Sequence, residues 1–176
     1  MKRKTRQILF LLLSVVLATI IGGSLYLYFC LKNSVPIRDG SAKVNGLIEE
    51  VEITFDQMGI PQIWSKTEHD GYFTLGYLHA SDRLFQMDMA RRVSQGRLSE
   101  LLGTVTLETD KKQRQIGHNR LARKALLSLD EKNMLRMQAY ADGVNAYTRT
   151  AGSLPFEYLL LGAKFEEWRV FDCMAL

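Results

Sequence analysis

The chain has 176 residues, of which 47% are hydrophobic, 10% aromatic and 24% charged. This composition is typical of a folding protein and excludes a disordered one, and the length allows one core of ordinary size plus an appendage. The isoelectric point is about 9.1, but residues 1–40 hold six cations and one anion, which leaves a net charge of about −1 on residues 41–176. The folded part is therefore nearly neutral, and we expect no nucleic-acid partner.

Residues 8–31 form an uncharged apolar run that is long enough, as a helix, to cross the roughly 30 Å hydrocarbon layer of a membrane. Residues 1–7 form a basic segment with four cations, which by the positive-inside rule stays in the cytoplasm and sends the remainder outward. A cleaved signal peptide shares the basic start and the apolar run, although this run is longer than a typical signal core and no clear A-x-A site follows it. We therefore expect an anchor or a signal segment, with the rest of the chain extracytoplasmic, either held at the membrane or secreted into the periplasm or beyond.

The two cysteines do not suggest a disulfide or a nucleophile. Cys30 lies in the apolar run and Cys173 lies near the end of the sequence, so they are not placed to reach each other. No base lies near Cys173 in the sequence, and a lone cysteine is more often a small buried apolar residue. We expect Cys173 to serve packing.

Residues 32–47 form a polar linker, and residues 48–176 form the region expected to fold. From Val51 to Phe55 apolar and polar residues alternate, which predicts a half-buried strand. Residues 56–59 have turn chemistry, and residues 60–64 follow as a short second strand with Pro61 at its start or edge. The sequence predicts a β-hairpin.

A helix is predicted from the capping-box spacing of Ser65 and Glu68 to about Gln95, with room for a break. Between residues 80 and 93 apolar side chains fall on two opposite sides at 100° per residue, which predicts a helix packed between layers. Five charged residues of this helix cannot all reach water: Asp82, Arg83, Asp88, Arg91 and Arg92. Because Asp88 lies three and four residues before two arginines, we expect a structural ion network and no catalytic role for these groups.

The remaining elements are predicted to be helical. Residues 99–102 precede a capping glycine, Gly103. Residues 110–129 form a basic segment whose cations are expected to face solvent: Lys111, Lys112, Arg114, Arg120, Arg123 and Lys124. The capping-box spacing of Ser128 and Glu131 predicts a further helix with one core-facing apolar stripe, closed by Gly152 and Pro155. The stripe consists of Met134, Met137, Tyr140, Ala141, Val144 and Tyr147.

These residues alone indicate no active site. His79 and Asp82 have helical spacing and His69 neighbours Asp70, but no second pair with zinc-like spacing accompanies them. The sequence contains no G-x-S-x-G elbow, no phosphate-binding loop and no H-E-x-x-H motif. We therefore assign no catalytic, substrate-binding or metal residue.

Several blocks, in order and spacing, resemble the start of the α subunit of penicillin acylases. They are residues 56–64, 76–77, 80–92, 95–103, 140–146 and 154–157, followed by Trp168 and Asp172. The resemblance covers about residues 48–176. Phe165 and Val170 depart from it, since relatives often have proline there, which leaves the shape of that loop open.

The resemblance implies an α+β fold, the N-terminal part of an αββα N-terminal-nucleophile hydrolase, here mostly helical with a β-hairpin. Such enzymes hydrolyse linear amides after self-cleavage of a precursor into α and β chains. Their nucleophile is the serine exposed at the start of the β chain, and its own α-amino group can act as base, so the chemistry needs no cofactor. Structural calcium is known in some members, and the pocket and calcium residues would follow Leu176. The resemblance therefore assigns no site residue within this sequence.

Two functional hypotheses follow. The first is a membrane-tethered or exported amide hydrolase, acting on penicillins or on acyl-homoserine lactones, of which this sequence is the N-terminal part and the β chain is the partner. The second is a short, non-catalytic, membrane-anchored module. In either case we expect residues 32–176 alone to have no amidase activity, because function depends on a site and not on a fold.

Overall fold

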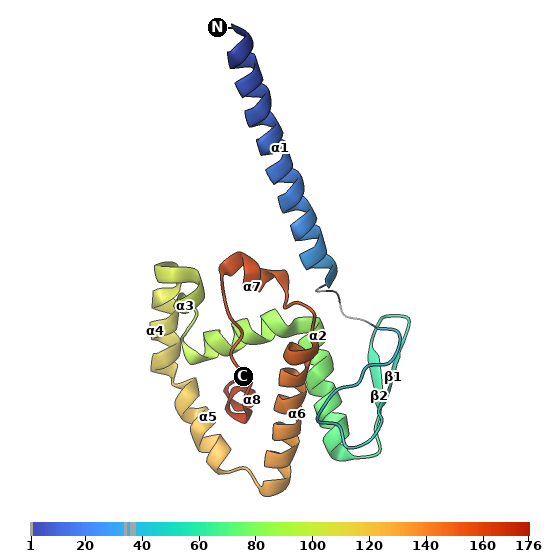
Figure 1. Ribbon diagram of the computed structural model, residues 1–176. Coiled ribbons are helices and arrows are strands. Elements are labelled where there is room, and N and C mark those ends of the chain that lie inside the picture. Colours follow the sequence, from blue (N-terminus) through green and yellow to red (C-terminus); the bar gives the residue numbers. More distant parts are fainter. Residues whose placement is uncertain (1, 34, 36–37) are drawn as a thin grey trace.

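The computed structural model describes residues 2–33, 35 and 38–176. A long helix, α1 (Lys2–Asn33), projects from a domain of shorter helices and one hairpin (Figure 1). Apart from Cys30, the described side chains of α1 are exposed, and Thr5–Asn33 is the one helix in the described residues long and apolar enough to cross a membrane. The predicted linker, 32–47, begins later than expected because α1 includes Lys32 and Asn33, and its residues 34, 36 and 37 lie outside the described part.

The predicted hairpin is confirmed. Strands β1 (Glu52–Phe55) and β2 (Pro61–Trp64) pair antiparallel, with Ile53 opposite Ile63. The Asp56 carboxylate closes the turn by accepting hydrogen bonds from the N–H groups of Met58, at 2.9 Å, and Ile60, at 2.8 Å. In β1 the alternation of exposed and half-buried residues follows the sequence pattern.

Helix α2 (Glu68–Gln95) begins at a different cap from the one predicted. Thr67, not Ser65, is the N-cap: its hydroxyl accepts the Asp70 N–H at 3.0 Å, while the Ser65 hydroxyl donates to the Thr67 carbonyl. The expected break is present at Arg83, whose backbone is non-helical.

Helix α6 (Glu131–Thr150) packs along α2 and also begins at another cap. Asp130, not Ser128, is its N-cap, because the Asp130 carboxylate accepts the Asn133 N–H at 2.7 Å. The core-facing stripe is confirmed, with Ala141, Val144 and Tyr147 buried. These three residues form the main core with Ala80 and Leu84 of α2, Tyr158 and Trp168.

The predicted helix over 110–129 is instead two helices, α4 (Leu107–Ile116) and α5 (His118–Leu127). Gly117, with φ 83°, ends α4 in a left-handed conformation that favours glycine. Before them lie α3 (Ser99–Leu102), closed by Gly103 as predicted, and the 3₁₀ helix η1 (Gly103–Thr106). The short helices α7 (Phe156–Leu161) and α8 (Val170–Ala175) complete the domain.

Candidate functional site

Asp88 of α2 lies at the centre of a buried ion network, as the sequence predicted. Its carboxylate accepts hydrogen bonds from Arg91 Nε at 3.1 Å and from Arg92 Nε at 3.2 Å. The Tyr158 hydroxyl on α7 donates to the same carboxylate at 3.2 Å. All four side chains are buried, so the pairing compensates charges that would otherwise destabilise the core.

Arg91 extends the network to the segment that leads into α8. Its guanidinium donates to the carbonyl oxygens of Glu166, at 3.1 Å, and Glu167, at 3.3 Å, and lies 3.4 Å from Asp172. The Phe165 and Trp168 rings lie over the guanidinium, with centroids 5.3 and 5.0 Å from Arg91 Cζ. Arg91 therefore holds the loop before α8 against α2.

Asp172 receives donors from both sides of this contact. Gln95 Nε2 donates to it at 2.8 Å, and the Arg169 N–H donates at 2.9 Å, which caps α8. The carboxylate is fully buried. The two residues that depart from the family pattern therefore have fixed positions. Phe165 packs against the main core, and Val170 is the first residue of α8.

At the surface end of the network Arg97 joins two half-exposed carboxylates. It lies 2.8 Å from Glu100 and 2.6 Å from Glu166. The Arg97 hydrogen bonds hold the pKa of each carboxyl below its usual value of 4.5, and together the two carboxylates raise the pKa of Arg97. These groups stay charged at neutral pH.

The titratable groups of this region are poorly suited to acid–base catalysis near neutral pH. Burial, followed by the neighbouring Asp88, raises the pKa of Tyr158 well above its usual 10. Burial also raises the pKa of the Cys173 thiol, and its sulfur accepts the Trp168 Nε1–H at 3.2 Å. A nucleophilic cysteine needs a lowered pKa, so Cys173 has a packing environment, as expected.

A hollow of about 440 Å³ lies between α5, α6 and α8. There the Asn145 side chain forms two hydrogen bonds with the Trp168 backbone. Its amide nitrogen donates to the Trp168 carbonyl at 2.7 Å, and its amide oxygen accepts from the Trp168 backbone N–H at 2.8 Å. Gln138 likewise bonds Asp142 at 2.9 Å. No serine, cysteine or histidine lines the hollow, so it has no nucleophile or imidazole base.

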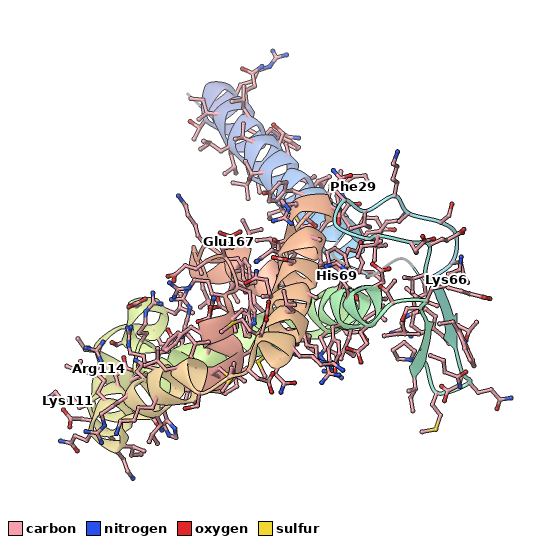
Figure 2. All side chains as sticks on the ribbon, turned by 90° about the horizontal axis from the view of Figure 1, so that it is seen from below. Phe29, Lys66, His69, Lys111, Arg114 and Glu167 are labelled. Carbon is pink, nitrogen blue, oxygen red and sulfur yellow. The ribbon has the colours of Figure 1, made fainter. Side chains whose placement is uncertain are left out.

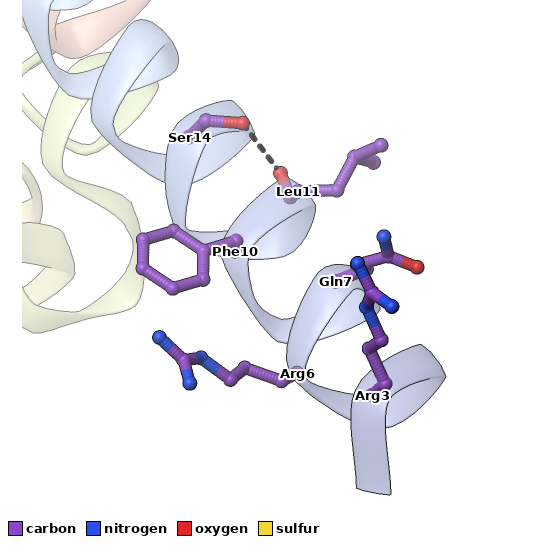
Figure 3. A pocket seen from close by; sticks show the side chains of 6 residues that line it. All are labelled: Arg3, Arg6, Gln7, Phe10, Leu11 and Ser14. Carbon is purple, nitrogen blue, oxygen red and sulfur yellow. Dashed lines mark hydrogen bonds between the residues drawn. The ribbon is translucent and has the colours of Figure 1, made fainter. Parts of the chain in front are cut away.

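A second hollow, of about 660 Å³, lies along α1 alone (Figure 3). Its lining residues come from successive turns of this one exposed helix: Arg3, Arg6, Gln7, Phe10, Leu11 and Ser14. The dashed bond in Figure 3 joins the Ser14 hydroxyl to the Leu11 carbonyl of the preceding turn. Among the described residues, only those of α1 line this space.

Two of the three histidines, His69 and His79, each hydrogen-bond a neighbouring side chain. His79 Nδ1 lies 3.0 Å from the Tyr140 hydroxyl, and burial raises the pKa of Tyr140 to about 12. His69 Nδ1 lies 3.2 Å from Asp70, whose carboxylate also accepts the Ile48 N–H at 2.8 Å. Within the described ranges no three histidine, cysteine or acidic side chains are placed to hold a metal ion.

The sequence predicted Asp88 with Arg91 and Arg92 but not the acidic residues that join them from outside this helix. Asp172, Glu100 and Glu166 lie outside the predicted helix and join it only through the tertiary fold. Of the five charged residues considered, Asp82 and Arg83 are exposed, and Asp82 lies 3.7 Å from Arg38. Arg97 and Glu100 have the i, i+3 spacing of a helical ion pair, so this one pair could have been predicted from the sequence.

The penicillin amidase family model matches residues 50–176. The chain belongs to this family. It is 40% identical over 148 residues to penicillin acylase 2 proenzyme of Pseudomonas sp. strain SE83, covering 83% of this chain and 19% of the relative. It is also 36% identical over 141 residues to the acyl-homoserine lactone acylase QuiP of Pseudomonas aeruginosa, covering 80% of this chain and 17% of the relative.

Among solved structures, a thermostable penicillin G acylase from Alcaligenes faecalis matches with a TM-score of 0.65 and 31% identity, covering 73% of this chain and 70% of that chain. The expected fold class is thereby confirmed: this amidase-family chain has the fold of the N-terminal part of an N-terminal-nucleophile hydrolase, mostly helical with one hairpin. The chain spans less than a fifth of the length of the curated relatives named here.

Proposed function

We propose that residues 48–176 form the N-terminal part of an enzyme that hydrolyses linear amides. The observation that carries this proposal is the 40% identity to penicillin acylase 2 over 83% of the chain. The relative is a proenzyme, which supports a precursor that is cut into α and β chains. The β chain is then the main partner.

We further propose that the catalytic serine lies outside residues 1–176, at the start of the β chain. The match of residues 50–176 to the penicillin amidase family supports this placement. In the proposed reaction the serine attacks the amide carbonyl and its α-amino group acts as base, so no cofactor is required. Structural calcium, where present, would use residues outside this sequence.

The role of the described residues in this enzyme is to hold the shape of the α chain. Asp88 and Arg91 join α2 to the loop before α8, and Asp70 fixes the chain that enters the hairpin. Helix α1 serves as the membrane anchor or export signal that places the enzyme on the extracytoplasmic side.

The substrate is an amide between an acyl group and an amine, and penicillins are the first candidate. Acyl-homoserine lactones are the second, because the QuiP relative of Pseudomonas aeruginosa is an acylase of that kind at 36% identity. Both contain a linear amide.

The placement of the serine is tested with the purified domain. Residues 32–176 are incubated with benzylpenicillin and, separately, with an acyl-homoserine lactone, and release of 6-aminopenicillanic acid or homoserine lactone is measured. We expect no release above the rate without protein. Turnover by the purified domain would place a nucleophile within these residues and contradict the proposal.

A further inference from the structure

Helices α4 and α5 carry a dense group of exposed cations, as the sequence predicted: Lys111, Lys112, Arg114, Arg120, Arg123 and Lys124. The two acidic residues of these helices offset only part of this charge: Glu108 pairs with Lys111 at 2.7 Å and Asp110 is buried, which leaves a net charge of +4. Among residues 38–176, no other cation of this group lies within ion-pair distance of a carboxylate. Helices α4 and α5 carry a net charge of +4, whereas the rest of residues 41–176 carries about −5, so these helices form a local positive surface on an otherwise acidic domain.

The outward side of α5 combines charge with exposed apolar groups. At 100° per residue Arg120, Lys124 and Leu127 fall within about 60° of one another, on the side opposite the buried Ala122. Leu127 is 87% exposed and Leu121 is 56% exposed. A basic amphipathic helix with apolar side chains among its cations is typical of a surface that lies against lipid headgroups.

The cations of α4 lie at one end of the domain. Figure 2 shows Lys111 and Arg114 at the end of the molecule farthest from the hairpin. Arg114 Nε also donates to the Gly96 carbonyl at 2.9 Å, which fixes α4 to the end of α2. The positive surface is therefore carried on packed helices.

The segment that joins α1 to the domain keeps this positive surface near the membrane that α1 is proposed to cross. Helix α1 ends at Asn33, and Val44 already packs against the domain core. Eleven residues separate these two points, which at 3.3–3.6 Å per residue limits their separation to roughly 40 Å. When α1 spans a membrane, the domain is thus held at a high effective concentration next to the headgroups.

We propose that the α4–α5 face docks on the anionic lipid headgroups of the membrane that α1 crosses. The inference rests on the proposed membrane placement of α1. Each cation at an anionic surface strengthens the attraction roughly fivefold, so loss of two lowers the ratio of docked to free domain by roughly 30-fold. Salt near 1 M, with a Debye length of about 3 Å, removes most of the effect.

The test uses the full chain reconstituted in vesicles. An environment-sensitive dye is attached at Leu127→Cys in a Cys30→Ser, Cys173→Ser background, and the vesicles contain either phosphatidylcholine alone or phosphatidylcholine with phosphatidylglycerol. The patch variant is Arg120→Gln with Lys124→Gln. The control variant, Arg149→Gln with Lys164→Gln, removes the same charge from exposed side chains outside α4 and α5.

We expect the dye emission to shift to the blue with phosphatidylglycerol, and the shift to be lost near 1 M salt and in the patch variant but retained in the control variant. Equal emission in both kinds of vesicle, or equal loss in both variants, would overturn the docking proposal. Flotation with the vesicles reports insertion of α1 separately. Failed flotation would contradict the membrane placement of α1 and the docking with it, whereas failed docking with intact flotation overturns the docking alone.

Discussion

Asp88 and Asp172 are fully buried carboxylates, and each accepts hydrogen bonds from at least one other element. Asp88 receives two arginines and the Tyr158 hydroxyl, and Asp172 receives Arg91 and Gln95. Removing one partner of such a network leaves the other charges buried without compensation, which costs more than the pair itself contributes. The residues that join α2 to α8 are therefore more sensitive to substitution than their surface counterparts.

Asp88→Asn is expected to lower the free energy of unfolding by about 3 kcal/mol, because Arg91 and Arg92 lose their shared counter-ion in the core. The measurement is urea unfolding of the full chain in detergent, followed by fluorescence of the buried Trp168. Asp82→Asn is the matched control, since Asp82 is exposed and 3.7 Å from Arg38, and its loss should cost less than about 1 kcal/mol. Equal losses in the two variants would argue against a structural network.

Acid should destabilise the domain through Glu100 and Glu166. Arg97 lowers the pKa of both carboxyls in the folded state, so their stabilisation is complete above the unfolded value near 4.5 and is lost as pH falls through the folded pKa. We expect unfolding free energy measured from pH 6 to pH 3 to fall, and Arg97→Met to reduce the slope. Both carboxylates are half-exposed, so the effect should be modest and weaken with salt. An unchanged slope in Arg97→Met would contradict this assignment.

At the scale of elements, the contact between α2 and α6 depends on glycine. A Cβ on Gly76 would overlap the Tyr140 carbonyl, and a Cβ on Gly143 would overlap the Phe73 carbonyl, so the two backbones touch at both points. Both atoms in the way belong to backbone, which yields less readily than a side chain. Any larger residue must push the helices apart.

Gly143→Ala is accordingly expected to lower the free energy of unfolding by about 1–3 kcal/mol, and the melting temperature with it. Gly152→Ala provides the matched control, because a Cβ there meets no atom within 4 Å. Thermal unfolding followed by circular dichroism compares them. Similar melting temperatures for the two variants would contradict the close approach of the helices.

Local patterns predicted these elements well where the signal was periodic. The alternation of residues 51–55 and the stripe on α6 were read correctly because one face of each is buried. Both capping boxes were placed two residues early, since Thr67 and Asp130 are also good N-cap residues and bind the N–H groups of Asp70 and Asn133. The break at Gly117 was missed because a single glycine is compatible with a continuous helix pattern.

For the site, sequence spacing revealed Asp88 with its arginines, since these lie on one helix. Asp172 and Glu166 could not be found in this way, because their partners are 81 and 69 residues away along the chain. The positive surface on α4 and α5 was visible as a charge run. The exposure of its leucines could not be predicted from the sequence, because it depends on how α4 and α5 pack on the domain.

At the scale of the whole molecule, α1 is the one helix among the described residues long and apolar enough to cross a membrane, and we propose that it sets where the domain works. We expect the helix to be retained as an anchor, because its apolar run exceeds a typical signal core. Mass spectrometry of the mature protein from membranes should then find a peptide that begins at Met1 or Lys2. A mature chain beginning near Lys32 would show a cleaved signal instead.

The central claim is that residues 48–176 act as the N-terminal part of an amide hydrolase. The direct test replaces the matching region of penicillin acylase 2 proenzyme from Pseudomonas sp. strain SE83 with these residues and measures amide hydrolysis by the chimera. We expect the chimera to mature into two chains and to hydrolyse the substrate of the parent enzyme. A chimera that is soluble and helical but neither matures nor turns over substrate, beside an active parent, would contradict the claim.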